Sequence, residues 1–162
     1  MKKRIAYFLA IVLLLGLCGC GQEAVKLHTP VNFYYLRVEP TYGSSDSLIA
    51  PVATEGFGYS GREAALLELY LTTAPDSEQY YSPFPADLKL LALDISGSTA
   101  DIQLDKSFAK LTGMDLTLAC ACLTLTVLDL TEVETVRITA KNATLDGVAQ
   151  IIMDRGLSLI HI

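Results

Sequence analysis

Histidine is nearly absent from this chain of 162 residues, which contains only His28 and His161. Both lie outside the segments that have a folding pattern, so the core has no histidine to act as the base of a Ser-His-Asp or Cys-His arrangement. The sequence also lacks a glycine-rich phosphate loop and a cluster of metal ligands. We therefore expect no enzyme activity and no cofactor. A hydrolase with two carboxylates leaves no spacing signature and stays as the least favoured alternative.

Cysteine is scarce too, with four residues, two of which lie near the N-terminus. Cys120 and Cys122 are two positions apart in a predicted helix and therefore point to different sides of it. We expect them neither to bridge each other nor to hold one metal ion together. Both are interpreted as small core residues.

A long apolar run is missing except at the N-terminus, where residues 5–17 follow three positive charges in residues 1–4. This run has about 13 residues, whereas a helix that spans a membrane needs roughly 20. A charged start followed by a short apolar run is typical of a secretory signal peptide that is cleaved. A permanent anchor is the weaker interpretation.

The segment Leu17, Cys18, Gly19, Cys20 directly after this run resembles a lipobox, in which a small residue precedes the cysteine that receives diacylglycerol. We predict lipidation of Cys20, with residues 1–19 as the signal peptide and an ordinary secreted protein as the alternative. Residues 20–29 would form a tether with a reach of about 30 Å. The lipid would hold the protein stably on the outer face of the cell membrane.

Basic residues are outnumbered, with 12 against 18 acidic residues in the whole chain. Removal of residues 1–19 would leave 9 basic and 18 acidic residues, a net charge of −9. Nucleic acid and an anionic membrane surface repel such a domain, so neither is an expected partner. We interpret the acidic residues as a solvated surface.

Apolar spacing predicts strands over residues 31–38, 48–54, 88–95, 99–104 and 133–140, and helices over 60–74 and 114–130. Ser60 and Glu63 have the spacing of a capping box at the start of the first helix. Pro51 favours an edge strand for residues 48–54. The order of elements predicts one α+β domain over residues 30–156, with two helices packed on one face of a small mixed or mainly antiparallel sheet.

Polar and aromatic side chains between these elements offer few candidates for a site. The loop Tyr80–Pro85 could dock on a partner, but we favour its packing over an open edge of its own core. Asp94, Asp101 and Asp105 could suggest catalytic carboxylates. Asp101 alternates onto the polar face of the predicted hairpin, so we interpret the three as solvated.

Several of these segments together resemble the GerMN domain family. They are the Ser-Pro-x-Pro loop at 82–85, the strands 88–95 and 100–104, Phe108, the Thr-Leu-Thr helix segment at 124–126 and the strand 133–138. The resemblance covers roughly residues 30–140. One departure is the segment Lys141–Ala143, which does not reproduce the glycine-containing turn that usually follows the last strand in this family.

The resemblance implies a bacterial envelope lipoprotein without known catalytic residues, in a family linked to sporulation and germination and similar in fold to ring-building motifs. Assembly with another envelope protein is therefore the expected function. A cell-wall glycan module is the alternative, since the aromatic faces of Tyr34, Tyr59, Tyr80 and Tyr81 could stack on sugars. Residues 157–162 resemble a translated sequencing adapter, so we expect them not to belong to the native chain.

Overall fold

The computed structural model describes residues 30–39, 47–54 and 61–156. The predicted signal peptide, the lipidation site Cys20, the tether and the tail over residues 157–162 lie outside the described residues. The same holds for Tyr59 and Ser60. The assignments made for these residues therefore stay predictions.

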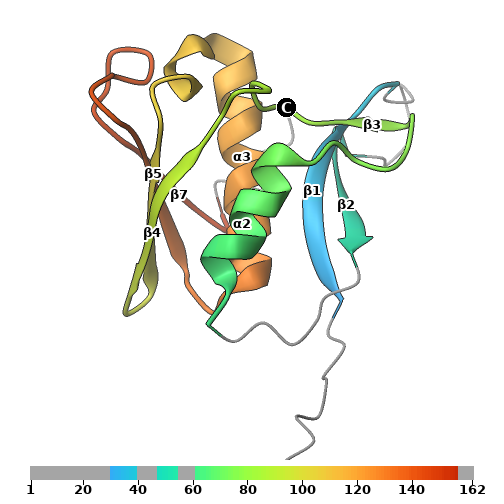
Figure 1. Cartoon of the computed structure of the whole chain (residues 1–162), viewed down its shortest axis with the longest axis horizontal. Helices are drawn as coiled ribbons and strands as arrows, with labels where there is room; N and C mark the ends of the chain where they lie inside the picture. Colours follow the sequence, from blue (N-terminus) through green and yellow to red (C-terminus); the bar gives the residue numbers. More distant parts are fainter. Residues whose placement is uncertain (1–29, 40–46, 55–60, 157–162) are drawn as a thin grey trace, which may run out of the picture.

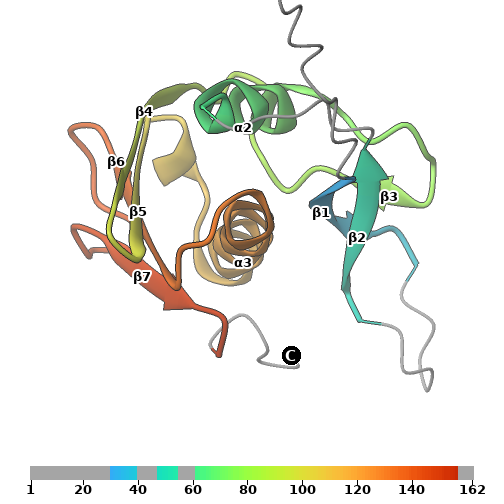
Figure 2. The ribbon, with the colours of Figure 1, turned by 90° about the horizontal axis from the view of Figure 1, so that it is seen from below.

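The described chain forms two helices, a short 3-10 helix and seven strands. In chain order they are β1 (Val31–Arg37), β2 (Ile49–Thr54), α2 (Glu63–Thr72), β3 (Tyr80–Tyr81), β4 (Leu90–Ser96), β5 (Thr99–Leu104), η1 (Phe108–Lys110), α3 (Gly113–Leu130), β6 (Thr135–Ala140) and β7 (Ile151–Asp154). The strand order is β2-β1-β3 in one sheet, called sheet A here, and β4-β5-β6-β7 in the other, sheet B. Only β5 and β6 pair in parallel. Helix α3 lies between the sheets, with α2 beside it (Figures 1 and 2).

The α+β class is confirmed, but the single sheet that we expected is replaced by two. The reason lies in α3, whose buried residues surround the helix axis: Leu116, Leu118, Ala119, Cys120, Ala121, Cys122, Leu123, Thr124, Thr126, Val127 and Leu128. A helix that is apolar all round needs cover on more than one side. By length and hydropathy α3 could also cross a membrane, yet 61 % of it is buried inside this domain.

The inner edge of β1 is closed by helix side chains. The Tyr34 N–H donates to the Thr126 hydroxyl at 3.1 Å, and the Tyr70 hydroxyl donates to the Tyr34 carbonyl. These two hydroxyl groups take the place that a neighbouring strand would occupy, so the buried backbone of β1 is satisfied. This contact gives a reason for a threonine near the end of an otherwise apolar helix.

The predicted strand β2 is an edge strand, as Pro51 indicated. Arg37 donates its N–H to Leu48, and hydrogen-bonded pairs alternate with pairs that have no hydrogen bonds along an antiparallel ladder. Tyr34 and Pro51 are three positions further along, so they form a pair without hydrogen bonds. At this position a backbone N–H would point away from β1. Because proline lacks that N–H, no hydrogen bond between β1 and β2 is lost.

Two local expectations need correction. Helix α2 begins at Glu63 with Arg62 at the N-cap, later than the predicted start at residue 60. Ser60 itself lies outside the described residues. The Glu63 carboxylate accepts the Gly61 N–H at 3.1 Å, which differs from a capping box, because there the glutamate accepts the N–H of the N-cap residue. Strand β7 was not predicted, since four residues are too few for a clear alternation. It follows a turn in which Asn142 adopts a φ of 56°, a conformation that asparagine tolerates where glycine is more usual.

Candidate functional site

The loop Tyr80–Pro85 packs on its own domain, as predicted. Its first two residues form β3, which pairs with Leu36 and Arg37 at the edge of β1. Phe84 then enters the core, where its ring meets Tyr70 edge to face at 5.2 Å. Tyr70 also contacts the rings of Phe33 and Tyr35. The loop therefore contributes mainly to the core, and Tyr81 alone stays 46 % exposed.

The tyrosines proposed for sugar stacking do not share one surface. Tyr81 pairs with Leu36, so it lies on the same face of sheet A as Tyr34, whereas Tyr80 pairs with Arg37 on the opposite face. Tyr34 is half-buried and its hydroxyl donates to Asp129 at 3.1 Å. Tyr80 is covered by the guanidinium of Arg37, which lies 5.7 Å from the ring centroid. Among those described, Tyr81 is the most exposed.

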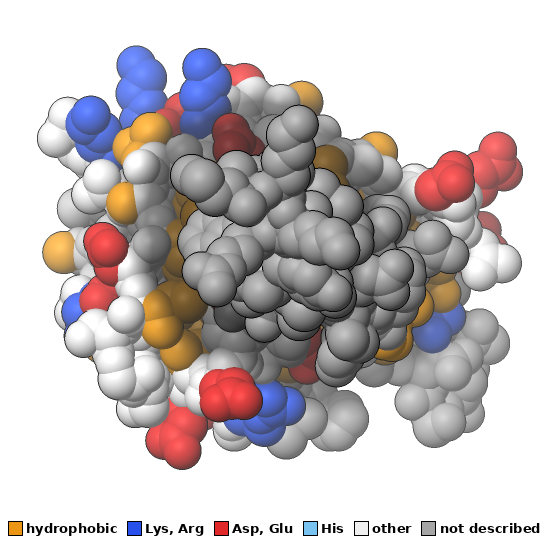
Figure 3. Space-filling model, turned by 60° about the horizontal axis from the view of Figure 1, so that its bottom comes forward, with side chains coloured by type: hydrophobic (Ala, Val, Ile, Leu, Met, Phe, Trp, Pro, Cys, Tyr) orange, Lys and Arg blue, Asp and Glu red, His pale blue; other side chains and the backbone are white. Residues whose placement is uncertain are grey.

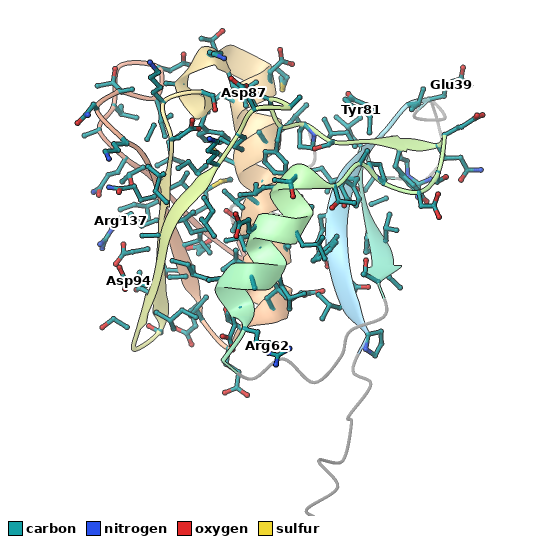
Figure 4. The ribbon with its side chains drawn as sticks, in the orientation of Figure 1. Glu39, Arg62, Tyr81, Asp87, Asp94 and Arg137 are labelled. Carbon is teal, nitrogen blue, oxygen red and sulfur yellow. The ribbon has the colours of Figure 1, made fainter. Side chains whose placement is uncertain are left out.

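The three carboxylates in and next to the β4–β5 hairpin differ in their surroundings. Asp94 and Asp101 are directly opposite each other on the outer side of sheet B, and Asp101 forms an ion pair with Arg137 at 2.7 Å (Figure 4). Burial tends to raise the pKa of Asp105, but hydrogen bonds from Ser107 and Lys89 outweigh it and leave this pKa below the ordinary value. A general acid needs a raised pKa, so Asp105 is unsuited to that role. Its carboxylate instead holds the turn after β5 through hydrogen bonds from Ser107 and Lys89.

The two described cysteines are buried thiols inside α3 and form no disulfide. Burial raises the pKa of Cys120 to about 12 and that of Cys122 still further. Such thiols remain protonated at neutral pH and are poor nucleophiles and metal ligands. Among the described residues, no group of three or more His, Cys, Asp or Glu side chains could hold a metal ion.

The two ends of the molecule differ in what they expose. At the lower end of Figure 1, where β1 and α2 begin, a shallow cleft of about 520 Å³ is lined by residues 131–134 and 154–156. Its lining includes the acidic residues Glu132, Glu134 and Asp154 and the basic residue Arg155, so the cleft is acidic on balance. The upper end consists of the loops that connect β3 to β4, β5 to α3 and β6 to β7.

Sequence reasoning missed the upper end, which exposes Lys89, Lys106 and Lys141 together with Met114 and Val148. The available signal was that Lys89 directly precedes β4, Lys141 directly follows β6 and Lys106 lies two positions after β5. Their proximity depends on the strand order β4-β5-β6, which the sequence does not show. This end is the main candidate for an interaction surface.

Comparison with known proteins identifies the domain. A family model described as Germane, sporulation and spore germination, matches residues 33–146. The first GerMN domain of the sporulation protein GerM from Bacillus subtilis has a similar structure, with a TM-score of 0.58 at 14% identity over 78% of this chain and 95% of that one. Comparison with curated proteins finds no match by sequence.

The tandem GerMN domains of the same Bacillus subtilis protein also match, with a TM-score of 0.53 and 19% identity. The match covers 70% of this chain but only 39% of the tandem structure. The match therefore spans about two fifths of the length of the tandem-domain structure, and at this level of identity the likeness concerns the fold.

Proposed function

The chain belongs to the Germane family of sporulation and spore germination domains, and on this basis we propose that it is a non-catalytic assembly module of the bacterial envelope. In this proposal, lipid on Cys20 holds the domain at the outer face of the cell membrane, where it binds another envelope protein during sporulation or germination. The family match over residues 33–146 is the observation that carries the proposal.

The described side chains support an assembly role. The buried hydroxyls of Tyr70 and Thr126 serve the backbone of β1, and Asp105 serves the turn before η1. Burial raises the pKa of Tyr70 well above its usual value, so this hydroxyl stays a donor. Groups that could carry chemistry are thus engaged in holding the fold, whereas the upper end leaves apolar and basic side chains exposed.

The position of the predicted anchor gives the domain a direction. Strand β1 begins at the lower end of the molecule, so a tether that joins it there would place the lower end toward the bilayer (Figure 1). Ten residues reach about 30 Å at most. The upper end would then face away from the membrane, where a partner could reach it.

The test is to isolate the full chain from its own envelope after mild chemical crosslinking, beside a Cys20→Ala variant. We expect the wild-type chain in the membrane fraction, crosslinked to one other envelope protein, and the variant released from the membrane. A wild-type chain that fractionates with soluble protein would contradict the anchor. A wild-type chain recovered only as a monomer would contradict assembly.

A glycan-binding module is the second candidate, favoured by the exposed ring of Tyr81. If the domain binds insoluble cell wall, Tyr81→Ala should abolish sedimentation with the wall. Leu91→Ala is the matched control, because Leu91 is a similarly exposed apolar residue on β4. Equal sedimentation of both variants would show that Tyr81 does not contribute to binding of the cell wall.

A further inference from the structure

Strand β4 lies at one edge of sheet B, and β7 lies at the other (Figure 2). The Leu104 carbonyl at the end of β5 accepts an N–H from the residue after β6, so it points toward β6. Because backbone groups alternate along a strand, Asp101 directs its N–H and C=O toward β4, where Asp94 is its partner. The N–H and C=O groups of Leu93 and Ile95 therefore point away from β5, toward the free edge.

The inner side of this edge is incompletely covered by its own domain. Leu93 and Ile95 pair with Ile102 and Ala100, which are buried, so these four side chains share the inner face of sheet B. Ile95 is nevertheless 47 % exposed, and Leu93 is half-buried. On the left of Figure 3, where sheet B lies, apolar side chains are visible beside acidic ones. A further strand beyond β4 would cover these apolar groups.

The other strand edges are less open. In β2 the Ser47 hydroxyl accepts the Ile49 N–H at 3.1 Å, and Pro51, the next residue that points outward, has no N–H. Strand β3 has two residues and β7 has four. Strand β4 has seven residues and contains neither proline nor lysine, which protect edges in many proteins. The register shift between Leu90 and Ala92 leaves a regular edge over residues 92–96.

A row of charged side chains crosses the outer face of sheet B and ends at this edge. Asp94 lies directly opposite Asp101, which in turn is level with Arg137. Arg137 forms an ion pair with Asp101 at 2.7 Å, whereas Asp94 forms no ion pair in the described part of the chain (Figure 4). Like charges directly opposite each other destabilise a sheet. A cation on the open side of Asp94 would complete the alternation of charge.

We propose that the free edge of β4 binds an extended segment of a partner protein in which a lysine or arginine lies between two apolar residues. The segment adds to sheet B as a strand antiparallel to β4. Its cation lies beside Asp94 on the outer face, and its apolar side chains cover Leu93 and Ile95 on the inner face. The pair across Asp94 has no hydrogen bonds, and such pairs bring side chains closest. This proposal rests on the assembly function above and names the chemistry of the partner.

A second copy of this chain fits the edge less well. The outer face of the regular part of β4 carries Ala92, Asp94 and Ser96, and that of β7 carries Ile152 and Asp154. Neither strand offers a cation to Asp94 of another copy. Strand β4 also begins at the upper end of the molecule, so a partner at that end is close to the edge (Figure 1).

The test is an NMR titration of the full chain in detergent, which follows the amide signals of Leu93 and Ile95. One capped peptide is Ser-Thr-Ile-Lys-Ile-Thr-Ser, and in a second peptide glutamate replaces lysine. The lysine peptide should shift both signals, and the glutamate peptide should bind about fivefold more weakly, because its charge repels Asp94. Equal affinity for both peptides would overturn the choice of a cation. Shifts confined to other amides would overturn the edge.

N-methylation of the lysine peptide tests the addition of a strand. In the proposed register the isoleucines direct their N–H groups toward β4, and the lysine directs its N–H away from it. N-methylation of the first isoleucine should weaken binding about tenfold, whereas N-methylation of the lysine should change the affinity by less than about twofold. Equal losses from both would overturn hydrogen bonding along the edge.

Two carboxylate variants test the position of the cation. Asp94→Asn should bind the lysine and glutamate peptides equally. Asp115→Asn, which removes an exposed carboxylate at the start of α3, should keep the preference of the wild type. Loss of the preference in both variants would reduce it to general attraction by an acidic domain and overturn the pairing with Asp94. Concentration-dependent shifts of the Leu93 and Ile95 amides without peptide would make a second copy the occupant and reject a separate partner.

Two further results separate this edge from the assembly function. Crosslinking in the native envelope that is equally strong for the wild type and Asp94→Lys keeps the assembly function and rejects the edge. A chain that binds the lysine peptide but is recovered from its envelope only as a monomer keeps the binding chemistry of the edge and rejects assembly.

Discussion

At the scale of a single residue, Asp105 makes the stability of the fold depend on pH. Its pKa lies below the ordinary value of 3.8 in the folded state, because hydrogen bonds from Ser107 and Lys89 outweigh the effect of burial. A depressed pKa means that the folded state favours the carboxylate. The stabilisation is therefore complete above the unfolded pKa and is lost as pH falls through the folded pKa.

We predict that Asp105→Asn flattens the loss of stability below about pH 4, measured by urea unfolding at a series of pH values. Asp94→Asn is the control, because Asp94 is exposed and lies on the same hairpin. An unchanged pH dependence in Asp105→Asn would show that this carboxylate does not contribute.

The buried thiols give a second prediction at this scale. Because burial raises the pKa of Cys120 to about 12 and that of Cys122 further, both should resist a thiol reagent at pH 8. Both should react within minutes after unfolding in guanidinium. Rapid labelling of either thiol in the native chain would mean that α3 is more accessible than the structure shows.

At the scale of the element, a hydrogen bond from the backbone of β1 to a side chain of α3 joins the strand to the helix. Substitution of two threonines in α3 tests how much this bond stabilises the fold. Thr126 accepts the Tyr34 N–H, whereas the buried hydroxyl of Thr124 has no partner among the described residues. Thr126→Val leaves a buried N–H unpaired and should lower the free energy of unfolding by about 1–3 kcal/mol. Thr124→Val should be neutral or stabilising.

Chemical unfolding of the two valine variants distinguishes these cases. The substitutions are matched in size, in helix and in burial, since both threonines are fully buried. Any general cost of valine in the helix therefore appears equally in both variants. Equal destabilisation of both variants would show that the hydrogen bond between Thr126 and Tyr34 does not stabilise the fold.

Local elements were predictable from the sequence, while their arrangement was not. The β4–β5 hairpin follows from alternation and a Ser-Gly-Ser turn, in which Gly97 adopts a φ of 58°. Strand β3 has two residues, and its pairing depends on where the core places the edge of β1. The division into two sheets depends on burial all round α3, of which the apolar stripe indicated one side.

The candidate surface was out of reach of the sequence for a related reason. Lys89, Lys106 and Lys141 are separated by up to 52 positions and meet only through the order of strands in sheet B. The tyrosines proposed to stack on sugars were chosen by residue type alone. The register of β1 with β3 separates Tyr80 from Tyr34 and Tyr81, and this register is set by tertiary packing.

At the scale of the whole molecule, the domain is acidic and its two ends differ. The lower end carries an acidic cleft and the start of β1, and the upper end exposes Lys89, Lys106 and Lys141. An anionic bilayer would repel the acidic cleft, so charge opposes close approach of the lower end to the membrane. The tether alone therefore turns the upper end outward, and its reach of about 30 Å leaves room between the cleft and the bilayer.

The most direct measurement of this claim is photo-crosslinking of the full, membrane-bound chain in its own envelope. A photoreactive residue replaces Met114 at the upper end in one variant and Thr131 at the lower end in the other. The account predicts a crosslink to one envelope protein from position 114 and none to that protein from position 131. A partner captured only from position 131, or equally from both positions, would contradict it.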